Sequence, residues 1–444
     1  MTLPYTLATT ATPDTLLAEL LFRRGIESES DQADFLTPSY GQLHDPTRLH
    51  NMKAAVDRIL AAVVAGEHIA IFSDYDCDGI PGAVVLHDFF TAAAYTNFSN
   101  TIPHRHYEGF GLSVSAVEKM AAAGAKLIIT IDCGTSNVAE VARARALGVD
   151  VIITDHHEPG EVLPEAVAVL NPKLGDYPFP HLCGTGVVFK LVQALLATGQ
   201  FPTILPGQEK WWLDLVGVAT IADLVPLVGE NRIFAHYGLT VLRKSRRPGL
   251  QALFRKAQID PRHLTEEDVG FTIGPRINAA SRMDAPEHAF ALLSTKSEAE
   301  APALVDHLEQ LNNQRKSAVA LMTREIHGRL ADREAPPPVI VMGNPLWRPA
   351  LVGLAANKLA EEYKCPVFLW GRDGNDVIKG SCRTGSSVSV VKLMEAAASV
   401  FREYGGHHAS GGFSVIDEHI FTLSDKLNQT FSELGHAALV AEPL

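Results

Sequence analysis

Apolar and polar residues alternate with two different periods along this 444-residue chain, and the period predicts the type of each element. Short apolar runs, which are typical of buried strands, occur at residues 68–72, 126–132, 149–155 and 166–171. Segments with helical spacing lie between or beside them, at residues 83–94, 115–123 and 137–147. Because strands that alternate with helices form βαβ units, the pattern predicts an α/β domain with a parallel sheet.

The pattern is mainly helical before this region and directly after it, and a second α/β region begins near residue 339. A long helical pattern from Ser297 to about Glu334 stops at the proline run 336–338, which predicts a connecting helix. The apolar run at 339–342 then predicts the first strand of a smaller α/β domain, with a cleft between the two domains. We therefore expect four parts: an N-terminal helical segment (1–65), the first α/β domain (66–296), the connecting helix (297–335) and the second domain (336–444).

Composition changes this picture only modestly. A formal net charge of −13 argues mildly against a nucleic-acid-binding protein, although residues 243–262 hold seven basic residues against one acid. Such a run is more often a solvated helix face than a wall that attracts phosphates. Five scattered cysteines indicate no disulfide framework. No apolar run reaches the roughly 18 residues of a membrane span, and the N-terminus has no signal-peptide pattern, so we expect a cytoplasmic protein.

The first predicted strand runs into an acidic loop, FSDYDCDGIPG, at residues 72–82. Asp74, Asp76 and Asp78 alternate and precede Gly79, which is how a calcium-binding EF-hand loop begins. The twelfth position of that loop requires a bidentate carboxylate, but here it is Val85. The loop also follows a strand rather than a helix. Three ionised carboxylates in one loop need a compensating cation, although a solvated acidic turn stays open as an alternative at this point.

Two further predicted strands end in residues that can bind metals. One strand runs into Asp132, another runs into Asp155, His156 and His157, and a later helical stretch ends at Asp223. A single Asp at a strand end can be only a helix cap. The carboxyl ends of parallel strands, however, meet at one edge of a sheet, so these side chains should converge. Several Asp residues with His suit two hard divalent ions, and such a pair suits hydrolysis of phosphoesters.

Longer motifs resemble a known family. The segments DYDCDG (74–79), TIDCGTS (130–136), TDHH (154–157) and ATIADLVPL (219–227) resemble the four motifs of the DHH phosphoesterase superfamily. Four further segments resemble the RecJ-like, single-strand-specific exonucleases of this superfamily: IPHRHYEGFGL (102–112), GTGVVFKL (184–191), VGENR (228–232) and GPRINAASRM (274–283). The segment YGGHHASGGFSV (404–415) resembles part of their DHH-associated domain. The resemblance covers roughly residues 15–420. It implies a metal-dependent 5′→3′ exonuclease that hydrolyses single-stranded DNA in repair and recombination, with a helicase and a single-strand-binding protein as partners.

The resemblance also implies a role for each matching residue near the metals. Two ions, Mn²⁺ before Mg²⁺, would be bound by Asp74, Asp76, Asp78, Asp132, His156 and Asp223. Asp132 would be shared between the ions, and Asp155 would support the ligands from behind. His157 would contact the scissile phosphate. The expected catalytic residues are His157, Asp132 and Asp155. An activated water would be the nucleophile, and no side-chain nucleophile is expected.

A second set of residues matches family positions that bind the 5′ end of the strand. This set comprises Arg105, Arg276, Asn278, Arg282, Ser381, Arg383, His407 and His408. Guanidinium groups suit a terminal phosphate because they offer a fork of donors. The alternative for Arg276 is an ordinary surface residue, and for Arg383 a residue that holds its own loop. Tyr107 and Phe110 could stack on an unpaired base, with core packing the first expectation for Phe110.

The chain departs from the family in ways that keep alternatives open. Its motifs GGHHASGG and DYDCDG differ from the commoner GGHPMAAG and DYDADG forms, and neither change removes an expected ligand. About 30 residues follow Val415, too few for the five-stranded oligonucleotide-binding barrel of longer members, so we expect that barrel to be absent. The alternative function is a phosphodiesterase for short oligonucleotides or cyclic dinucleotides. A non-catalytic replication scaffold ranks lower because no expected Asp or His is missing.

Overall fold

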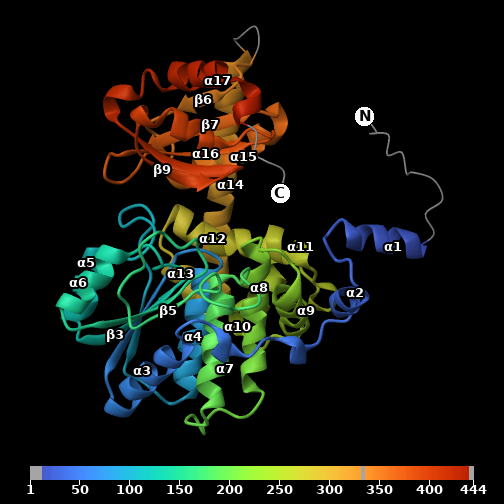
Figure 1. Ribbon diagram of the computed structural model, residues 1–444, viewed down its shortest axis with the longest axis vertical. Helices are drawn as coiled ribbons and strands as arrows, with labels where there is room; N and C mark the ends of the chain where they lie inside the picture. The colour runs from blue at the N-terminus through green and yellow to red at the C-terminus, as the bar shows by residue number, and fades with distance from the viewer. Residues whose placement is uncertain (1–12, 332–335, 440–444) are drawn as a thin grey trace. The chain divides into compact units, whose positions relative to one another are not determined.

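The computed structural model describes residues 13–331 and 336–439, and the chain divides into two compact units (Figure 1). Unit 1 comprises Met1–Ile102, Gly111–Gly274 and Leu293–Glu298, as far as these residues are described. Unit 2 comprises Pro103–Phe110, Pro275–Leu292 and Ala299–Leu444, with the same restriction. A short segment, Pro103–Phe110, therefore leaves unit 1 between two of its own elements and packs in unit 2. No helix within the described ranges is long and apolar enough to cross a membrane.

Unit 1 contains a five-stranded parallel sheet, as predicted. Its strands run in the order β2-β1-β3-β4-β5. They are β1 (His68–Ser73), β2 (Phe98–Thr101), β3 (Ala125–Ile131), β4 (Asp150–Thr154) and β5 (Ala168–Leu170). The sequence pattern missed β2, because its residues FSNT include one apolar side chain and are all only half-buried. As the edge strand next to β1, β2 has no need of the continuous apolar run that identifies a central strand.

Helices cover both faces of this sheet, which explains why its strands are apolar at consecutive positions. Phe72, Ile128 and Ile153 pack in one cluster with the apolar sides of α5 (Val114–Ala122) and α6 (Val138–Ala146). Ile69 and Ile71 alternate with Phe72 and are fully buried on the opposite face. The helices α3 (Met52–Ala65), α4 (Gly79–Ala92) and α7 (Gly184–Ala197) contact the strands there (Figure 1).

Further helices complete unit 1. Before the sheet come α1 (Pro13–Phe22) and α2 (Glu29–Leu36), with the short turns η1 (Tyr40–Gln42) and η2 (Pro46–Arg48). After it come η3 (Gln208–Trp212), α8 (Leu213–Ala222), α9 (Gly229–Leu242), α10 (Pro248–Ala257), η4 (Pro261–His263), α11 (Glu266–Asp268) and the π-helical turn η5 (Val269–Ile273). The helical stretch predicted to end at Asp223 is thus a 3₁₀ turn followed by α8.

The predicted connecting helix is present as α14 (Ala301–Ala331), which follows α12 (Gly274–Met283) and α13 (Glu287–Ser294). Its 31 residues would span about 46 Å at 1.5 Å per residue. Val305, Leu308 and Ile326 are among its buried side chains. The last predicted residues of this helix, 332–335, lie outside the described part of the chain.

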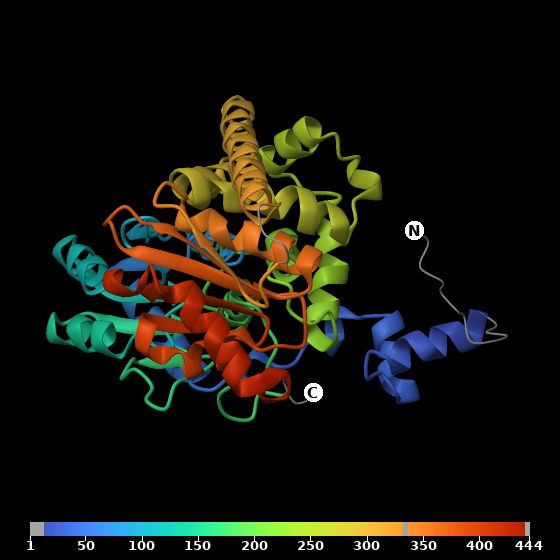
Figure 2. The same cartoon turned by 90° about the horizontal axis from the view of Figure 1, so that it is seen from above.

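Unit 2 contains a mixed sheet whose order is β6-β7-β8-β10-β9. Its strands are β6 (Ile340–Gly343), β7 (Pro366–Arg372), β8 (Ile378–Thr384), β9 (Phe401–His407) and β10 (Ser410–Val415). Among these described strands only the β6–β7 pair is parallel. Met342 and Leu369 pack with α14 and α15 (Pro349–Tyr363) on one face. Phe368 and Phe413 pack on the other face with α16 (Val390–Ala396) and α17 (Leu423–Leu439). Figure 2 shows the helices of unit 2 on the two faces of this sheet. The short turns η6 (Ala398–Val400) and η7 (Asp417–His419) complete the unit.

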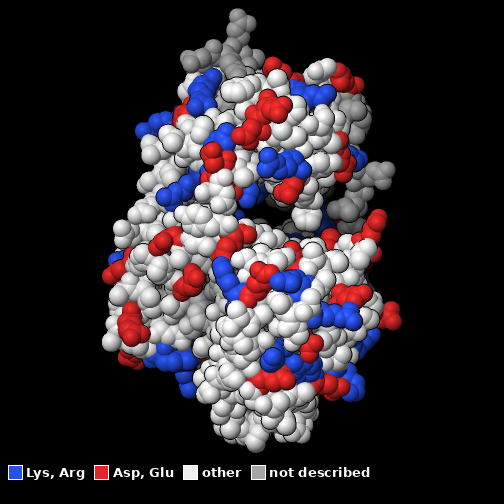
Figure 3. Space-filling view, turned by 90° about the vertical axis from the view of Figure 1, so that its left-hand side faces the viewer, with Lys and Arg blue, Asp and Glu red and all other residues white. Residues whose placement is uncertain are grey.

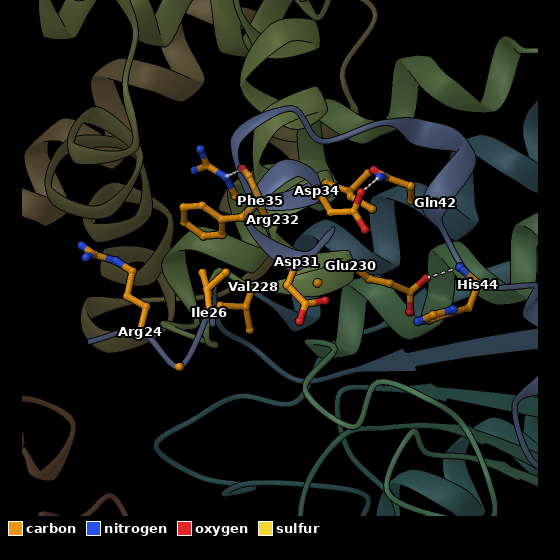
Figure 4. Close-up of a pocket in the computed structure, with 13 residues that line it drawn as sticks. Arg24, Ile26, Asp31, Asp34, Phe35, Gln42, His44, Val228, Glu230 and Arg232 are labelled. Carbon is orange, nitrogen blue, oxygen red and sulfur yellow. Dashed lines mark hydrogen bonds between the residues drawn. The ribbon is translucent and has the colours of Figure 1, made fainter. Parts of the chain in front are cut away.

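A fully buried ion pair ties the N-terminal segment of unit 1 to its helical part. Lys190 Nζ lies 2.5 Å from Glu230 Oε1, and both side chains are at most 1% exposed. Glu230 also accepts hydrogen bonds from the His44 backbone N–H (2.9 Å) and the Tyr177 hydroxyl (2.6 Å). Figure 4 shows Glu230 directed toward His44 beside a cavity of about 390 Å³ between α2 and α9. Burial lowers the pKa of Lys190, and Glu230 opposes that effect.

We expect Glu230→Ala to lower the free energy of unfolding by about 3–5 kcal/mol, because it leaves the Lys190 ammonium buried without its carboxylate. The matched control is Asp57→Ala, which breaks the exposed Lys53–Asp57 pair and should cost at most about 1 kcal/mol. Urea unfolding of both variants measures the difference. Equal losses in the two variants would contradict the role given to the buried pair.

Candidate metal centre

Three aspartates stand at the carboxyl ends of neighbouring strands in unit 1, where backbone hydrogen bonds align them. The Asp74 N–H donates to the Ile131 carbonyl at the end of β3 (3.0 Å). In the same way Asp132 donates to Thr154 at the end of β4 (2.8 Å), and Asp155 donates to Leu170 at the end of β5 (3.0 Å). Each aspartate therefore continues the ladder by one residue. The three carboxylates lie at one edge of the sheet, as the sequence pattern predicted.

The backbone at Asp132 has an unusual conformation. Its φ is 59°, in the left-handed region that Asp and Asn tolerate better than most residues. Gly134 follows with a φ of 121°, and a Cβ there would lie 2.7 Å from Thr130 Oγ1. A Cβ at Gly184 would lie 2.6 Å from Asp132 Cβ, so only glycine lets the start of α7 approach this closely. The chain thus turns sharply after β3 and keeps the Asp132 side chain at the sheet edge.

Helix N-termini hold two of the loop aspartates. The Asp78 carboxylate accepts from the backbone N–H groups of Gly184 (2.6 Å) and Thr185 (2.7 Å), at the start of α7. Asp76 Oδ1 accepts from the N–H groups of Asp78 (2.8 Å) and Gly79 (3.2 Å), at the start of α4. Backbone donors and the positive end of a helix both favour an ionised carboxylate. These bonds fix the orientation of both aspartates.

His156 lies among three carboxylates from three different segments. Its Nε2 atom is 3.2 Å from Asp132 Oδ1, 3.7 Å from Asp223 Oδ2 and 3.8 Å from Asp78 Oδ2. Asp223 is the C-cap of α8, where the helix dipole disfavours a negative charge. Helix capping therefore does not explain Asp223. Its carboxylate instead lies with Asp78 and His156 in one set of donor atoms that could hold an ion.

Asp155 supports the histidine pair rather than facing the other carboxylates. Its Oδ1 accepts from the backbone N–H of His156 (2.7 Å) and lies 2.7 Å from His157 Nδ1, while Oδ2 accepts from the Thr135 N–H (2.9 Å). Burial raises the pKa of Asp155, but these donors outweigh burial and bring it below its ordinary value. Burial likewise lowers the pKa of His157, and Asp155 outweighs that effect and raises it to about 9.

The remaining carboxylates oppose one another. Burial and the neighbouring Asp78 and Asp76 raise the pKa of Asp132 far above its ordinary value, and the same causes raise the pKa of Asp223 to about 8. Asp132 Oδ1 is buried and accepts no hydrogen bond from any described residue. A buried, unsatisfied carboxylate oxygen is costly unless a cation binds it. The donor set therefore fits metal ions, and its charge is enough for more than one.

Three overlapping sets of donor atoms lie within 4.8 Å of one another in this part of unit 1, and each set could hold an ion. They are Asp74 with Asp76 and Asp132, Asp78 with His156 and Asp223, and Asp132 with His156 and His157. Asp132 belongs to two of the sets. The third set contains His156, whose Nε2 lies 3.2 Å from Asp132 Oδ1. Oxygen and imidazole donors of this kind suit Mn²⁺ or Mg²⁺. The geometry thus brings together all six residues predicted as metal ligands.

The nearby cysteines are not part of this donor set. None of the five cysteines, all of which lie in the described ranges, forms a disulfide, and Cys77 and Cys133 are buried. Burial, reinforced by neighbouring carboxylates, raises the pKa of both thiols well above the ordinary value. Metals bind thiolates rather than thiols. The prediction of hard divalent ions agrees with this chemistry.

The residues predicted to bind the 5′ end all lie in unit 2, and some already have structural partners there. Arg276 Nε donates to Glu309 Oε2 of α14 at 2.6 Å, and Arg282 Nη1 donates to the Ala350 carbonyl at 2.6 Å. Arg383 donates to the Cys382 carbonyl at 2.7 Å, which agrees with the alternative that it holds its own loop. Asn278 lies on α12 between the first two arginines. Their roles toward a substrate stay predictions.

The glycine-histidine motif at 404–415 forms a β-hairpin. Residues of β9 and β10 pair across it, with Ser410 opposite His407. His408 lies in the turn, and its Nε2 is 3.0 Å from the Ser387 carbonyl oxygen. Ser381 and Arg383 lie two residues apart on the adjacent strand β8, and a Cβ at Gly353 would lie 3.2 Å from both side chains. Glycine at position 353 thus lets α15 pack closely against Ser381 and Arg383.

The segment Pro103–Phe110, which carries Arg105, is attached to unit 2 by its neighbours. His106 Nε2 lies 3.1 Å from the Arg282 carbonyl oxygen, and Asn375 donates to the Tyr107 carbonyl at 3.3 Å. Tyr107 is 63% exposed and Phe110 is 55% exposed. The expectation of core packing for Phe110 is therefore wrong, because the segment runs along the surface of unit 2. Both rings are accessible for stacking.

The basic run at 243–262 is largely occupied with structure. Arg247 is buried and binds Asp214 and Asp88, and Arg243 donates to the Leu264 carbonyl. Arg246 stacks on the ring of Trp211. These contacts do not support a wall of phosphate-binding charge at this run. Figure 3 shows another face of the molecule, on which Lys and Arg side chains are intermingled with Asp and Glu.

Sequence reasoning missed the residues that hold the aspartates in place. Gly184 and Thr185 fix Asp78, and Asn171 links Thr135 to the carbonyl of His157. The motif GTG at 184–186 belongs to a segment that resembles the family, but its contact with Asp78 spans 106 residues of sequence. One feature of the sequence could have indicated this contact: the helix begins with glycine and has no acidic residue in its first turn. The free backbone N–H groups of such a terminus can bind a carboxylate from another part of the chain.

Comparison with known proteins finds relatives that match most of the chain. Residues 68–220 match the DHH family, N-terminal domain, and residues 337–433 match the DHHA1 domain. The chain is 37% identical over 418 residues to the single-stranded-DNA-specific exonuclease RecJ of Bacillus subtilis, covering 93% of this chain and 52% of that protein. It is 35% identical over 438 residues to the same enzyme of Salmonella typhimurium, covering 94% of this chain and 74% of that protein. The crystal structure of RecJ in complex with Mn²⁺ from Thermus thermophilus has a TM-score of 0.80 at 30% identity, over 94% of this chain and 59% of that one.

We expect Asp132→Asn to weaken Mn²⁺ binding at least about 100-fold, because it removes the charge that two donor sets share. Asparagine tolerates the left-handed backbone, whereas alanine would add about 1–2 kcal/mol of strain. In chelator the melting temperature should not fall, since the substitution relieves repulsion among buried carboxylates. Calorimetric titration and thermal unfolding measure both effects, with the exposed Asp150→Asn as control. Unchanged Mn²⁺ affinity would overturn the assignment of Asp132.

Proposed function

Because the chain belongs to the RecJ family of DHH proteins, we propose that it is a metal-dependent exonuclease that degrades single-stranded DNA from the 5′ end. The observation that carries this proposal is the buried Asp132 oxygen, which has no hydrogen-bond partner among the described residues and lies where the donor sets meet. The chain spans about half of the Bacillus subtilis relative and three quarters of the Salmonella one. The activity of the whole enzyme is therefore part of the proposal.

Two divalent ions are the proposed cofactors, Mn²⁺ before Mg²⁺, since structures of related RecJ proteins are complexes with each of these ions. Asp74 and Asp76 would hold one ion, Asp78, His156 and Asp223 the other, and Asp132 both. When bound, such ions supply Lewis acidity for phosphoester hydrolysis. The backbone donors on Asp76 and Asp78 fix the ligands before any ion arrives. The site then needs little reorganisation to bind.

His157 is proposed to act on the phosphate itself. Its Nδ1 is held by Asp155, which orients the ring and leaves Nε2 as the nitrogen directed to substrate. A carboxylate that holds a histidine in this way stabilises the protonated ring. His157 would then stabilise negative charge on the phosphate and supply a proton to the departing oxygen. Asp155 acts through His157 and is a positioning residue in this account.

Unit 2 supplies the proposed recognition of the 5′ end. Arg105, Arg276 and Arg383 offer guanidinium groups, while Ser381, Asn278, Arg282, His407 and His408 offer further donors. Tyr107 and Phe110 present exposed rings for the first bases. A helicase that exposes single strands and a single-strand-binding protein that covers them are the proposed partners in the cytoplasm. The substrate is a strand with a 5′-phosphate.

The activity is tested on a 5′-phosphorylated single strand of about 40 nucleotides, labelled at either end, with Mn²⁺ or with chelator. We expect labelled mononucleotides to appear at once from the 5′ label and only late from the 3′ label. Chelator or a complementary strand should stop the reaction. Turnover of two- to five-residue oligonucleotides without digestion of the long strand would replace this proposal with the small-substrate phosphodiesterase.

We expect Arg276→Ala to raise KM for 5′-phosphorylated DNA about 10-fold, because it removes a charge-assisted hydrogen bond to the terminal phosphate. The change for a 5′-hydroxyl strand should be much smaller. Arg324→Ala, an exposed arginine of α14, is the control for net charge. If both strands lose activity equally, Arg276 serves the structure through Glu309 and has no role in recognising the phosphate.

A further inference from the structure

A second group of metal-binding side chains lies in unit 2 and shares no residue with the candidate metal centre of unit 1. It comprises Asp284, directly after α12, His288 on α13 and His307 on α14. The three come from separate elements that converge at one place. No motif of the sequence singled them out, because their spacing along the chain matches no recognisable metal-binding pattern.

The donor atoms have the spacing of a coordination shell. Asp284 Oδ2 lies 3.2 Å from His288 Nε2 and 3.3 Å from His307 Nε2, and all three atoms lie within 4.8 Å of one another. Tetrahedral ligands at about 2.0–2.1 Å from an ion are about 3.3 Å apart. The two distances to Asp284 match that edge. All three residues therefore offer one donor atom to a common point.

A salt bridge alone explains this group poorly. His307 Nε2 is buried and has no hydrogen-bond partner among the described residues, although the Asp284 carboxylate is 3.3 Å away. The two imidazole rings are close, with centroids 4.3 Å apart at 65°. One carboxylate can satisfy one protonated histidine, but two protonated rings at this distance would repel each other. Two neutral rings and one carboxylate facing a cation satisfy all three groups.

We propose that Asp284, His288 and His307 form a separate site for a divalent transition-metal ion of the Zn²⁺ class. Two imidazoles and one carboxylate suit Zn²⁺ better than Mg²⁺ or Ca²⁺, which prefer all-oxygen shells. Water completes the shell, since the side chains are 38–47% exposed and solvent reaches them. The ion's place in the chain indicates a structural role: it joins the α12–α13 turn to α14.

The same elements carry residues that are proposed to bind the 5′ end, so an ion bound here would also affect the position of those residues. Glu309, two residues after His307 on α14, holds Arg276 of α12. Met283, next to Asp284, accepts a hydrogen bond from Arg348 at the start of α15. An ion bound between Asp284, His288 and His307 would stiffen this joint and so fix the position of α12. The inference about metal binding itself does not depend on the proposed function.

The test uses the full chain with Asp132→Asn, so that the hard-metal centre binds weakly, at pH about 7.5, above the ordinary imidazole pKa of about 6.5. Co²⁺ is the probe, because its visible absorption reports imidazole ligands in a low-coordinate site, and Zn²⁺ is the competitor. We expect one Co²⁺ per chain, displaced by Zn²⁺, and a rise of several degrees in melting temperature with Zn²⁺. His288→Gln and His307→Gln should each weaken binding at least about 100-fold.

The control is His327→Gln. His327 is on the same helix and also pairs with a carboxylate, Glu362 at 3.0 Å, but it belongs to no cluster of metal-binding side chains among the described residues. This variant should bind Co²⁺ like its parent. Equal binding in all three histidine variants, or no bound Co²⁺ in the parent, would overturn the proposal. Because the substituted side chains are partly exposed, circular dichroism should show all variants folded; a variant that is not is replaced by Asp284→Asn, with the same expected loss.

Discussion

Mutual repulsion of buried carboxylates is the constraint on which the functional part of unit 1 depends. The parallel sheet brings Asp74, Asp132 and Asp155 to one edge, and the loop and α8 add Asp76, Asp78 and Asp223. Burial strengthens electrostatic interaction, so this arrangement is unfavourable unless cations bind. The surrounding structure is organised to hold the charges in place: α4 and α7 direct backbone donors at Asp76 and Asp78, and the left-handed turn keeps Asp132 at the edge.

The aspartates divide into two kinds by their partners. Asp155 is satisfied by backbone donors and His157, so it is charged without a metal and orients the histidines. Asp132 has an oxygen with no partner among the described residues, and its ionisation is opposed by its neighbours. Asp155 thus orients the histidines, whereas Asp132 needs a bound cation to satisfy its oxygen. Asp155 can therefore share the site with five other carboxylates without itself being a ligand.

Much of unit 1 could be predicted because its strands are buried on both faces and end in aspartate. The edge strand β2 could not, because a half-buried strand of four polar and apolar residues has no distinctive period. In unit 2 only β6 was predicted, and the antiparallel order of the other strands depends on pairings far apart in sequence. Long-range partners were also out of reach. The bonds from Gly184 to Asp78 and from Arg276 to Glu309, and the approach of His307 to Asp284, all depend on tertiary structure.

The proposed function depends on two ions that share Asp132, and anomalous X-ray diffraction at the manganese edge from crystals grown with Mn²⁺ tests that directly. Two peaks about 3.5–4 Å apart, with an Asp132 oxygen close to both, are the predicted result. A single peak, or peaks that do not contact Asp132, would contradict the central claim. In that case the crowded carboxylates would need another source of compensating charge.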